Sequence, residues 1–221
     1  MCSIFGILDI KTGADALRPI ALECSRLLRH RGPDWSGIYN NDHAILVHER
    51  LSIVDTEHGA QPLYNENKTH VLAVNGEIYN HKALASELTV DYKFQTASDC
   101  EVILPLYKEH GVNFVDKLQG MFAFIIYDET NNSYLIARDH IGIIPLYTGY
   151  DAEGNFYVAS EMKALMPICK TVSEFPPGHI LDSNVGELQR YYKRNWQKYD
   201  AIKDNTTSKT KIREALEESV K

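Results

Sequence analysis

Short strand-like segments, most of them in hairpin-like pairs, constrain the fold of this chain more than any other feature of its sequence. Each segment is rich in aromatic and β-branched residues, and turn clusters such as those at 40–42, 131–133 and 151–154 separate them. The predicted strands are residues 3–10, 44–51, 70–74, 121–128, 134–139, 144–150 and 156–160. Helices fall in only a few places between them, without strict strand–helix alternation. This pattern predicts an α+β fold with largely antiparallel sheets and excludes a doubly wound nucleotide-binding fold.

Helical periodicity predicts the remaining elements of the fold. The predicted helices are residues 14–31, a short one after Asn80, 98–110 and 114–119. In the first of these, Leu17, Cys24 and Leu28 fall on one face, and the Gly32-Pro33 pair that follows acts as a stop. Pro105 lies inside the third pattern, where it would cost about 3 kcal/mol in a regular helix interior. We therefore expect a kink at Pro105.

Composition and charge define the broad class of the protein. The 221 residues carry 30 acidic and 23 basic side chains, and this acidic balance argues against binding to nucleic acid or to an anionic membrane. No apolar stretch approaches the roughly 20 residues that span a bilayer, and no secretory signal is evident. The four cysteines are far apart without a C-x-x-C pair, as is typical of free thiols in a reducing compartment. The sequence therefore predicts a cytoplasmic globular protein.

The character of the chain changes after Tyr199. Residues 200–211 are polar and nearly free of large apolar side chains, as in a linker. The closing segment then places Ile212 and Leu216 on one helical face, and such a face must be buried somewhere. We therefore expect one domain over residues 1–199, and over 200–221 a linker and the first helix of a further domain.

Cys2 can combine a thiol and a base in one residue if Met1 is removed, as is usual when a small residue follows the initiator. A thiol has an ordinary pKa of about 8.5 and an α-amine one of about 7.7 to 8.0, so the amine can accept the thiol proton near neutral pH. The strand predicted over residues 3–10 would hold this nucleophile on a rigid element. A cysteine after the initiator can equally lack a function, and the residue alone does not decide between the two.

The Asn75-Gly76 pair also has two interpretations. Asn-Gly between apolar runs is a strong signal for a hairpin turn. Alternatively, the side-chain amide of Asn75 and the backbone N–H of Gly76 could both bind a developing oxyanion. The sequence leaves both open.

Arg50 and Asp99 form a third candidate constellation. The planar guanidinium of Arg50 can bind a carboxylate through two hydrogen bonds, and Asp99 can bind an ammonium group. Together they would satisfy an amino-acid zwitterion. Taken singly, each is equally consistent with a solvated charge or a helix cap.

The sequence predicts neither a metal nor a cofactor in this chain. The nine histidines show no H-x-x-x-H pattern and no Cys/His cluster with ligand spacing. No G-x-G-x-x-G and no Walker loop is present, so no segment is suited to cradle a phosphate.

Taken together, eight motifs in this order resemble one family. They are CSIFGI at 2–7, RHRGPD at 29–34, HERLSIVD at 48–55, NGEIYNH at 75–81, SDCEVI at 98–103, GMFAF at 120–124, ARD with a following glycine and PLY at 137–147, and SEMKAL at 160–165. The sequence resembles the N-terminal class II glutamine amidotransferase domain of glutamine-hydrolysing asparagine synthetases, close to the bacterial B type. The resemblance extends from Cys2 to about Tyr199.

The resemblance implies the N-terminal-nucleophile hydrolase fold, a four-layer αββα sandwich, and hydrolysis of glutamine to glutamate and ammonia. In that family the N-terminal cysteine, here Cys2, attacks the side-chain amide of glutamine. Asn75 and Gly76 match the pair that binds the oxyanion.

The resemblance also implies a set of substrate-binding residues. Arg50 matches the residue that binds the substrate carboxylate, and Glu77 with Asp99 matches the groups near its ammonium. The backbone that follows Arg50 lines the same pocket; it comprises Leu51, Ser52, Ile53 and Val54.

Family members continue into a synthetase domain that uses ATP and Mg²⁺ to activate aspartate and accepts the ammonia. Its Ser-Gly-Gly-Leu-Asp-Ser loop does not occur in these residues, so we expect that domain to be the partner of this chain. The resemblance also allows a homodimer. Two other interpretations stay open: the glutaminase domain of another class II amidotransferase, and a non-catalytic glutamine-binding module.

Overall fold

The computed structural model describes residues 1–52 and 59–220, and the chain divides into two compact units. The larger unit is Met1–Tyr191 and the smaller is Tyr192–Lys221. The larger unit therefore ends before the boundary at residue 199 that the sequence predicts. We describe the two units separately.

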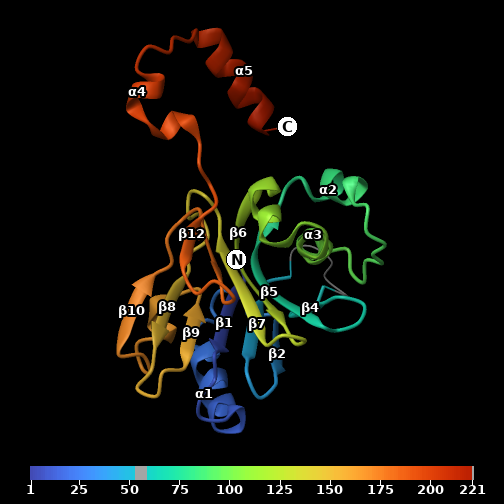
Figure 1. Ribbon diagram of the computed structural model, residues 1–221, viewed down its shortest axis with the longest axis vertical. Helices are drawn as coiled ribbons and strands as arrows, with labels where there is room; N and C mark the ends of the chain where they lie inside the picture. The colour runs from blue at the N-terminus through green and yellow to red at the C-terminus, as the bar shows by residue number, and fades with distance from the viewer. Residues whose placement is uncertain (53–58, 221) are drawn as a thin grey trace. The chain divides into compact units, whose positions relative to one another are not determined.

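Two six-stranded antiparallel sheets form the larger unit (Figure 1). The first sheet contains, in this order, β10 (Thr171–Glu174), β8 (Tyr147–Tyr150), β9 (Phe156–Ala159), β1 (Ser3–Leu8), β3 (Ile45–Arg50) and β2 (Trp35–Asn40). The second contains β12 (Leu188–Arg190), β11 (His179–Asp182), β7 (Ser133–Arg138), β6 (Gly120–Asp128), β5 (His70–Ile78) and β4 (Leu63–Tyr64). All of these neighbouring strands pair in the antiparallel sense.

The helices cover the two outer faces of the stacked sheets. Helix α1 (Ala14–Arg26) packs on the first sheet, in a core with Phe5 and Val47. The second sheet is covered by α2 (His81–Glu87), η1 (Asp99–Val102), α3 (Ile103–His110) and η2 (Gly111–Lys117). A third core, which includes Ile4 and Ile125, fills the space between the sheets. The predicted α+β fold with four αββα layers is confirmed.

Strand β1 shows why the apolar runs of this sequence are nearly continuous. Its side chains alternate between the two faces of the first sheet, so Ile4 enters the core between the sheets while Phe5 enters the core under α1. Because both faces are covered, all six residues are buried. Full burial of each large apolar side chain stabilises the fold by about 1.5 to 3 kcal/mol.

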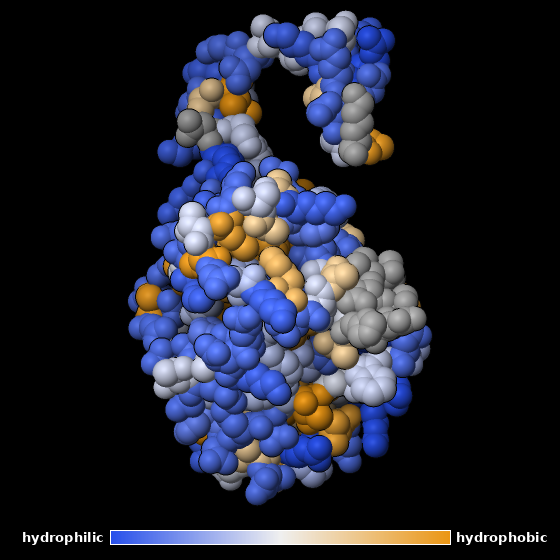
Figure 2. All heavy atoms as spheres, turned by 90° about the vertical axis from the view of Figure 1, so that its right-hand side faces the viewer, coloured by the Kyte–Doolittle hydropathy of each residue, from blue (hydrophilic) through white to orange (hydrophobic). Residues whose placement is uncertain are grey.

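Apolar side chains gather in only small patches on the face of the molecule drawn in Figure 2.

Three of the predicted helices differ from the structure, and the one predicted over residues 114–119 is the 3₁₀-helix η2, Gly111–Lys117. Helix α1 ends at Arg26, not at Arg31, and turns follow. Further along, Gly32 packs directly on β3, where a Cβ would overlap the carbonyl oxygen of Glu49. Instead of the kink expected at Pro105, the 3₁₀-helix η1 changes to the α-helix α3 just before this residue. Pro105 lies in the first turn of α3, where backbone N–H groups have no partner within the helix, so its missing N–H costs nothing there.

The strand predictions hold for the buried strands and fail elsewhere. Strand β5 continues to Ile78, so Asn75 and Gly76 lie within a strand opposite Ala123 and Phe122, and the hairpin-turn interpretation is wrong. Strand β8 begins at Tyr147, not at residue 144. The sequence patterns missed β2, β4, β10, β11 and β12.

The smaller unit contains η4 (Asn195–Gln197), α4 (Tyr199–Ile202) and α5 (Lys209–Val220). Helix α5 is the predicted closing helix, and Ser208 caps its start by accepting a hydrogen bond from the Lys211 N–H at 3.2 Å. Its apolar residues Ile212, Leu216 and Val220 are exposed. Among the described residues, no helix is both long and apolar enough to cross a membrane.

Asp139 fixes the loop that joins β7 to β8. Its buried carboxylate accepts hydrogen bonds from the backbone N–H groups of Ile141, Gly142, Ile143 and Ile144 and from that of Phe122 on β6, at 2.7 to 3.4 Å. A single carboxylate thus orders the whole loop against the second sheet.

We expect Asp139→Ala to lower the free energy of unfolding by about 3 kcal/mol or more, because it leaves several buried N–H groups without an acceptor. Urea denaturation followed by circular dichroism would measure the change. The exposed Asp42→Ala serves as the control and should change the free energy of unfolding by less than about 0.5 kcal/mol. Equal stability of the two variants would contradict the role assigned to Asp139.

Candidate functional site

A cavity of about 100 Å³ lies where the ends of β1, β3 and β5 meet η1. The predicted site residues that line it are Cys2, Arg50, Leu51, Asn75, Gly76, Glu77 and Asp99. Ser52 is not among the lining residues, and its N–H donates to Asp34 Oδ2 at 2.8 Å. The predicted residues Ile53 and Val54 lie outside the described part of the chain.

Strand alternation explains why side chains from β3 and β5 meet in this cavity. On β3, Leu46 faces the second sheet, and Arg50 has the same parity. On β5, Val71 and Ala73 face the first sheet, and Asn75 continues that face. The two strands therefore direct Arg50 and Asn75 into one end of the space between the sheets.

Cys2 immediately precedes β1 and is held through its sulfur atom. The Leu51 N–H donates to Cys2 Sγ at 3.3 Å, and the thiol donates back to the Leu51 carbonyl oxygen at 3.5 Å. Burial raises the pKa of the Cys2 thiol, although the Leu51 N–H, the chain's amino group and Arg50 act in the opposite direction. The thiol is therefore protonated at neutral pH and needs a base to become a nucleophile.

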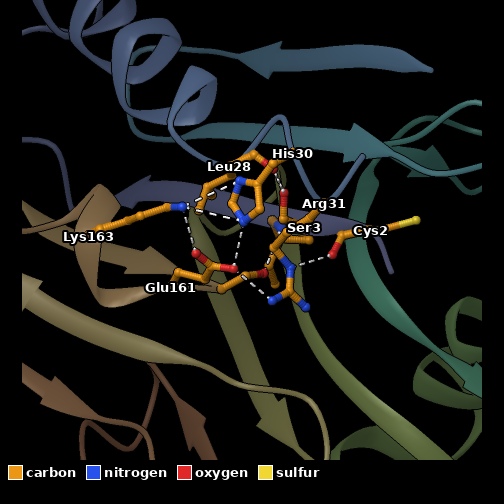
Figure 3. Close-up of polar contacts among 9 residues, drawn as sticks. Cys2, Ser3, Leu28, His30, Arg31, Glu161 and Lys163 are labelled. Carbon is orange, nitrogen blue, oxygen red and sulfur yellow. Dashed lines mark hydrogen bonds and ion pairs between the residues drawn. The ribbon is translucent and has the colours of Figure 1, made fainter. Parts of the chain in front are cut away.

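The Cys2 carbonyl oxygen has a partner that the sequence analysis did not anticipate. Arg31 Nε donates to it at 3.1 Å, and Arg31 Nη1 donates to Glu161 Oε1 at 2.9 Å (Figure 3). Both residues belong to motifs on which the resemblance rests, but a helix stop was a sufficient local explanation for Arg31.

Asn75, which lines the cavity, has an unsatisfied hydrogen-bond donor among the described residues. The residue is only 2% exposed, and in the described part of the chain its Nδ2 has no hydrogen-bond partner. A buried polar group without a partner costs about 1 to 3 kcal/mol. An acceptor oxygen placed in the cavity beside Cys2 would satisfy it.

Gly76, the next residue, is required by close packing between strands. A Cβ at this position would overlap the carbonyl oxygen of Met121 on β6. Glycine therefore lets β5 approach β6 at the cavity wall.

The cavity holds charges of both signs. Arg50 lies at the end of β3. Glu77 and Asp99 also line the cavity, and their side chains share a hydrogen bond. Burial raises the pKa of Glu77, and the neighbouring Asp99 raises it further. Asp99 is held in place by the Ile78 N–H, which donates to Oδ2 at 2.6 Å. One cation and two adjacent carboxylates can bind a zwitterion.

Further cavity residues lay beyond the sequence predictions. They include Met1, Cys100, Met121 and Ile144. The buried Cys100 thiol donates to the Gly76 carbonyl oxygen at 3.5 Å, and burial raises its pKa well above the ordinary value. The raised pKa favours the protonated form of the Cys100 thiol at neutral pH. Within the described residues, no group of three or more His, Cys, Asp or Glu side chains is arranged to hold a metal ion.

Two stacked antiparallel sheets with helices outside them, and a cysteine at the start of a central strand, define the N-terminal-nucleophile hydrolase fold. Residues 1–201 match the family model described as a glutamine amidotransferase domain. The chain belongs to this glutamine amidotransferase family.

Proteins similar to this chain carry related names. This chain is 66% identical over 221 residues to the glutamine-hydrolyzing asparagine synthetase B of Escherichia coli (strain K12). The match covers 100% of this chain and 40% of the relative. The chain is 48% identical to a probable glutamine-hydrolyzing asparagine synthetase of Dictyostelium discoideum, covering 100% of this chain and 41% of the relative. The chain thus spans about two fifths of the length of these relatives.

Similarity to solved structures extends over most of the fold. The glutamine phosphoribosylpyrophosphate amidotransferase of B. subtilis, complexed with ADP and GMP, matches with a TM-score of 0.71 and 26% identity. The match covers 87% of this chain and 50% of that structure.

We expect Asn75→Ala to change the free energy of unfolding by less than about 1 kcal/mol, although the residue is buried, because the substitution also removes an unsatisfied donor. The neighbouring Val74→Ala is the control and should cost about 2 kcal/mol, since it removes methyl groups from a packed core. Urea denaturation of both variants gives the comparison. A cost for Asn75→Ala as large as that for Val74→Ala would show that Nδ2 has a partner in solution.

Proposed function

We propose that this chain is the glutaminase domain of an asparagine synthetase, in which Cys2 hydrolyses glutamine to glutamate and ammonia. The observation that carries the proposal is that Asn75, whose buried Nδ2 has no partner among the described residues, lines the same cavity as Cys2. A nucleophile beside an unsatisfied hydrogen-bond donor is the arrangement that acyl transfer requires.

The mechanism begins with removal of Met1, which converts the Cys2 nitrogen from an amide into an amine. The amine accepts the thiol proton, and Sγ attacks the side-chain amide carbon of glutamine. Asn75 Nδ2 and the Gly76 N–H bind the resulting oxyanion. The amine then returns the proton to the leaving nitrogen, ammonia departs, and a thioester remains. Water, activated by the same amine, hydrolyses the thioester to glutamate and restores the thiol.

The charged groups of the cavity determine which substrate binds. We assign the α-carboxylate of glutamine to Arg50, which can bind it through two hydrogen bonds, and the α-ammonium to Glu77 and Asp99. The cation and the carboxylates occupy different walls of the cavity, so the substrate side chain is directed toward Cys2. The backbone of Leu51, Ser52, Ile53 and Val54 completes the predicted binding set.

The names of the relatives support the assignment to asparagine synthetase. Identity reaches 66% with the asparagine synthetase B of E. coli and 26% with the phosphoribosylpyrophosphate amidotransferase of B. subtilis.

We assign the ammonia to a synthetase domain that uses ATP, Mg²⁺ and aspartate, and we assign no cofactor to this chain. The four free cysteines support a cytoplasmic location. A homodimer stays a prediction.

We expect the purified chain to release glutamate from glutamine and Cys2→Ala to abolish this release while still binding glutamine. Alanine also permits removal of Met1, so the variant isolates the loss of the thiol. A coupled glutamate assay and isothermal titration calorimetry measure the two properties. The control is Cys169→Ala, which removes a cysteine outside the cavity and should retain full activity.

Three results of this experiment would separate the candidate functions. Glutamate release by Cys2→Ala at the original rate would contradict the mechanism. Binding of glutamine by the unsubstituted chain without turnover would favour a glutamine-binding module. Full activity with Met1 retained, as shown by intact-mass spectrometry, would exclude the amine as the base.

We expect glutamine affinity to fall as the pH is lowered through the raised pKa of Glu77. Burial and the neighbouring Asp99 favour the protonated form of Glu77 in the free protein, although His81 acts in the opposite direction. The ligand ammonium favours the ionised form, so binding is tightest above this pKa and weakens below it. Titration calorimetry on Cys2→Ala between about pH 5 and 8 measures the effect.

Glu77→Gln is the matched control because it keeps the shape of the side chain and removes the titration. It should bind glutamine more weakly, with a flatter pH dependence over the same range. An identical pH profile for Glu77→Gln would assign the effect to another group.

A further inference from the structure

A charged cluster on the side of Cys2 away from its sulfur comprises His30, Arg31, Glu161 and Lys163 (Figure 3). Glu161 lies just after β9, while Arg31 follows the turns after α1, so two distant segments meet here. Glu161 Oε1 accepts from Arg31 Nη1 at 2.9 Å and lies 3.2 Å from His30 Nε2. Its Oε2 lies 3.1 Å from Lys163 Nζ.

The members of the cluster differ in exposure. The side chains of Arg31 and Glu161 are 13% and 24% exposed, whereas those of His30 and Lys163 are 52% and 50% exposed. Exposed ion pairs contribute little because water competes for both partners, so the shielded Arg31–Glu161 pair is the significant contact. Burial acts to raise the pKa of Glu161, but the hydrogen bonds from Arg31 and Lys163 outweigh it and hold this pKa at about 2. Glu161 therefore stays ionised at any pH where the protein works.

Arg31 depends on Glu161 for its orientation. Its guanidinium makes two contacts in this cluster: Nε to the Cys2 carbonyl oxygen at 3.1 Å and Nη1 to Glu161. Nη2 is buried and has no partner in the described part of the chain. Without Glu161, a single hydrogen bond would have to hold the guanidinium against its tendency to turn into water.

The orientation of Arg31 matters because of where Cys2 lies. Pairing of β1 with its neighbours begins at Ser3, so Cys2 is outside the strand ladder. After Met1 is removed, Cys2 is a chain terminus, and termini fray unless side chains or neighbouring groups hold them. Leu51 holds the sulfur atom, and Arg31 holds the carbonyl oxygen. Two anchors on opposite sides of Cα fix the direction of both the thiol and the amine.

We propose that Glu161 is a positioning residue, which through Arg31 keeps the terminal Cys2 in the orientation that attack on the substrate requires. Glu161 contacts neither the cavity nor the reacting atoms, so its effect passes entirely through Arg31. The inference rests on the proposed function of Cys2, and it adds a remote determinant of the rate.

The test compares Glu161→Ala with Lys163→Ala in protein whose Met1 removal has been verified by intact-mass spectrometry. Lys163 contacts the same carboxylate but lies far more exposed, and none of its contacts involves Cys2 or Arg31. We expect Glu161→Ala to lower kcat about 10-fold to 100-fold, since small misplacements of a nucleophile have effects of this size. KM should change by less than about twofold because the substrate-binding groups are untouched. Lys163→Ala should leave both constants within about twofold.

A second readout does not require glutamine turnover. Iodoacetamide labelling followed by peptide mass spectrometry measures the reactivity of each cysteine separately. In Glu161→Ala, a released terminus should expose the Cys2 thiol and increase its labelling rate several-fold, while the buried Cys24 and Cys100 stay protected. A simple loss of stability would instead increase labelling of all of these cysteines.

The outcomes separate the two proposals. Unchanged kcat in Glu161→Ala, an equal loss in Lys163→Ala, or labelling that increases at every cysteine would overturn the role of Glu161. Absence of glutaminase activity in the unsubstituted chain would overturn the proposed function, while selective labelling of Cys2 in Glu161→Ala would still support its positioning by Glu161. Partial recovery of kcat in Glu161→Gln, whose amide oxygen can still accept from Arg31, would support it further.

Discussion

The stacking of the two sheets is the constraint on which the site depends. Because strand side chains alternate with a period of two, the strands that bury both faces must send every second residue into the space between the sheets. His48 on β3 uses that space to contact the Val74 carbonyl oxygen on β5 at 3.0 Å, and burial lowers its pKa to about 3, so it bridges the sheets as a neutral ring. The strand that ends in Arg50 is thereby held against the strand that carries Asn75. A one-residue shift in the register of β3 would remove Arg50 from the cavity, and the same shift in β5 would remove Asn75.

The cavity keeps features that a structure selected for stability alone would lose. Among the described residues, Asn75 Nδ2 is buried without a partner, and Glu77 and Asp99 place two carboxylates side by side. The unpaired amide and the two adjacent carboxylates both raise the free energy of the folded protein. A ligand with an acceptor oxygen at one end would pair with the amide, and an ammonium at its other end would reduce the repulsion between the carboxylates. The three apolar cores offset these costs. The groups suited to bind such a ligand are therefore the same groups whose burial or proximity destabilises the cavity.

The sequence was informative where burial imposes a pattern. Strands covered on both faces, such as β1 and β6, were predicted because their apolar runs are continuous. Strands β10 and β12 are largely exposed, so their sequences contain no alternation of apolar and polar residues that would predict a strand. Part of the set of cavity residues was predicted from ordered motifs, since no local pattern brings Cys2 and Asn75 together. The contact of Arg31 with Cys2 could not be predicted, because a helix stop explains the same residues and the contact exists only in the folded chain.

The anchors of Cys2 also show how a nucleophile can be held before it becomes active. Leu51 contacts the sulfur atom and Arg31 the carbonyl oxygen, so neither contact uses the backbone nitrogen. Removal of Met1 changes only that nitrogen, from a planar amide without basicity to an amine with an ordinary pKa of about 7.7 to 8.0. The geometry of the thiol therefore need not change at this step. In the proposed mechanism, folding sets the position of the Cys2 thiol, and removal of Met1 supplies the base that the raised pKa of this thiol demands.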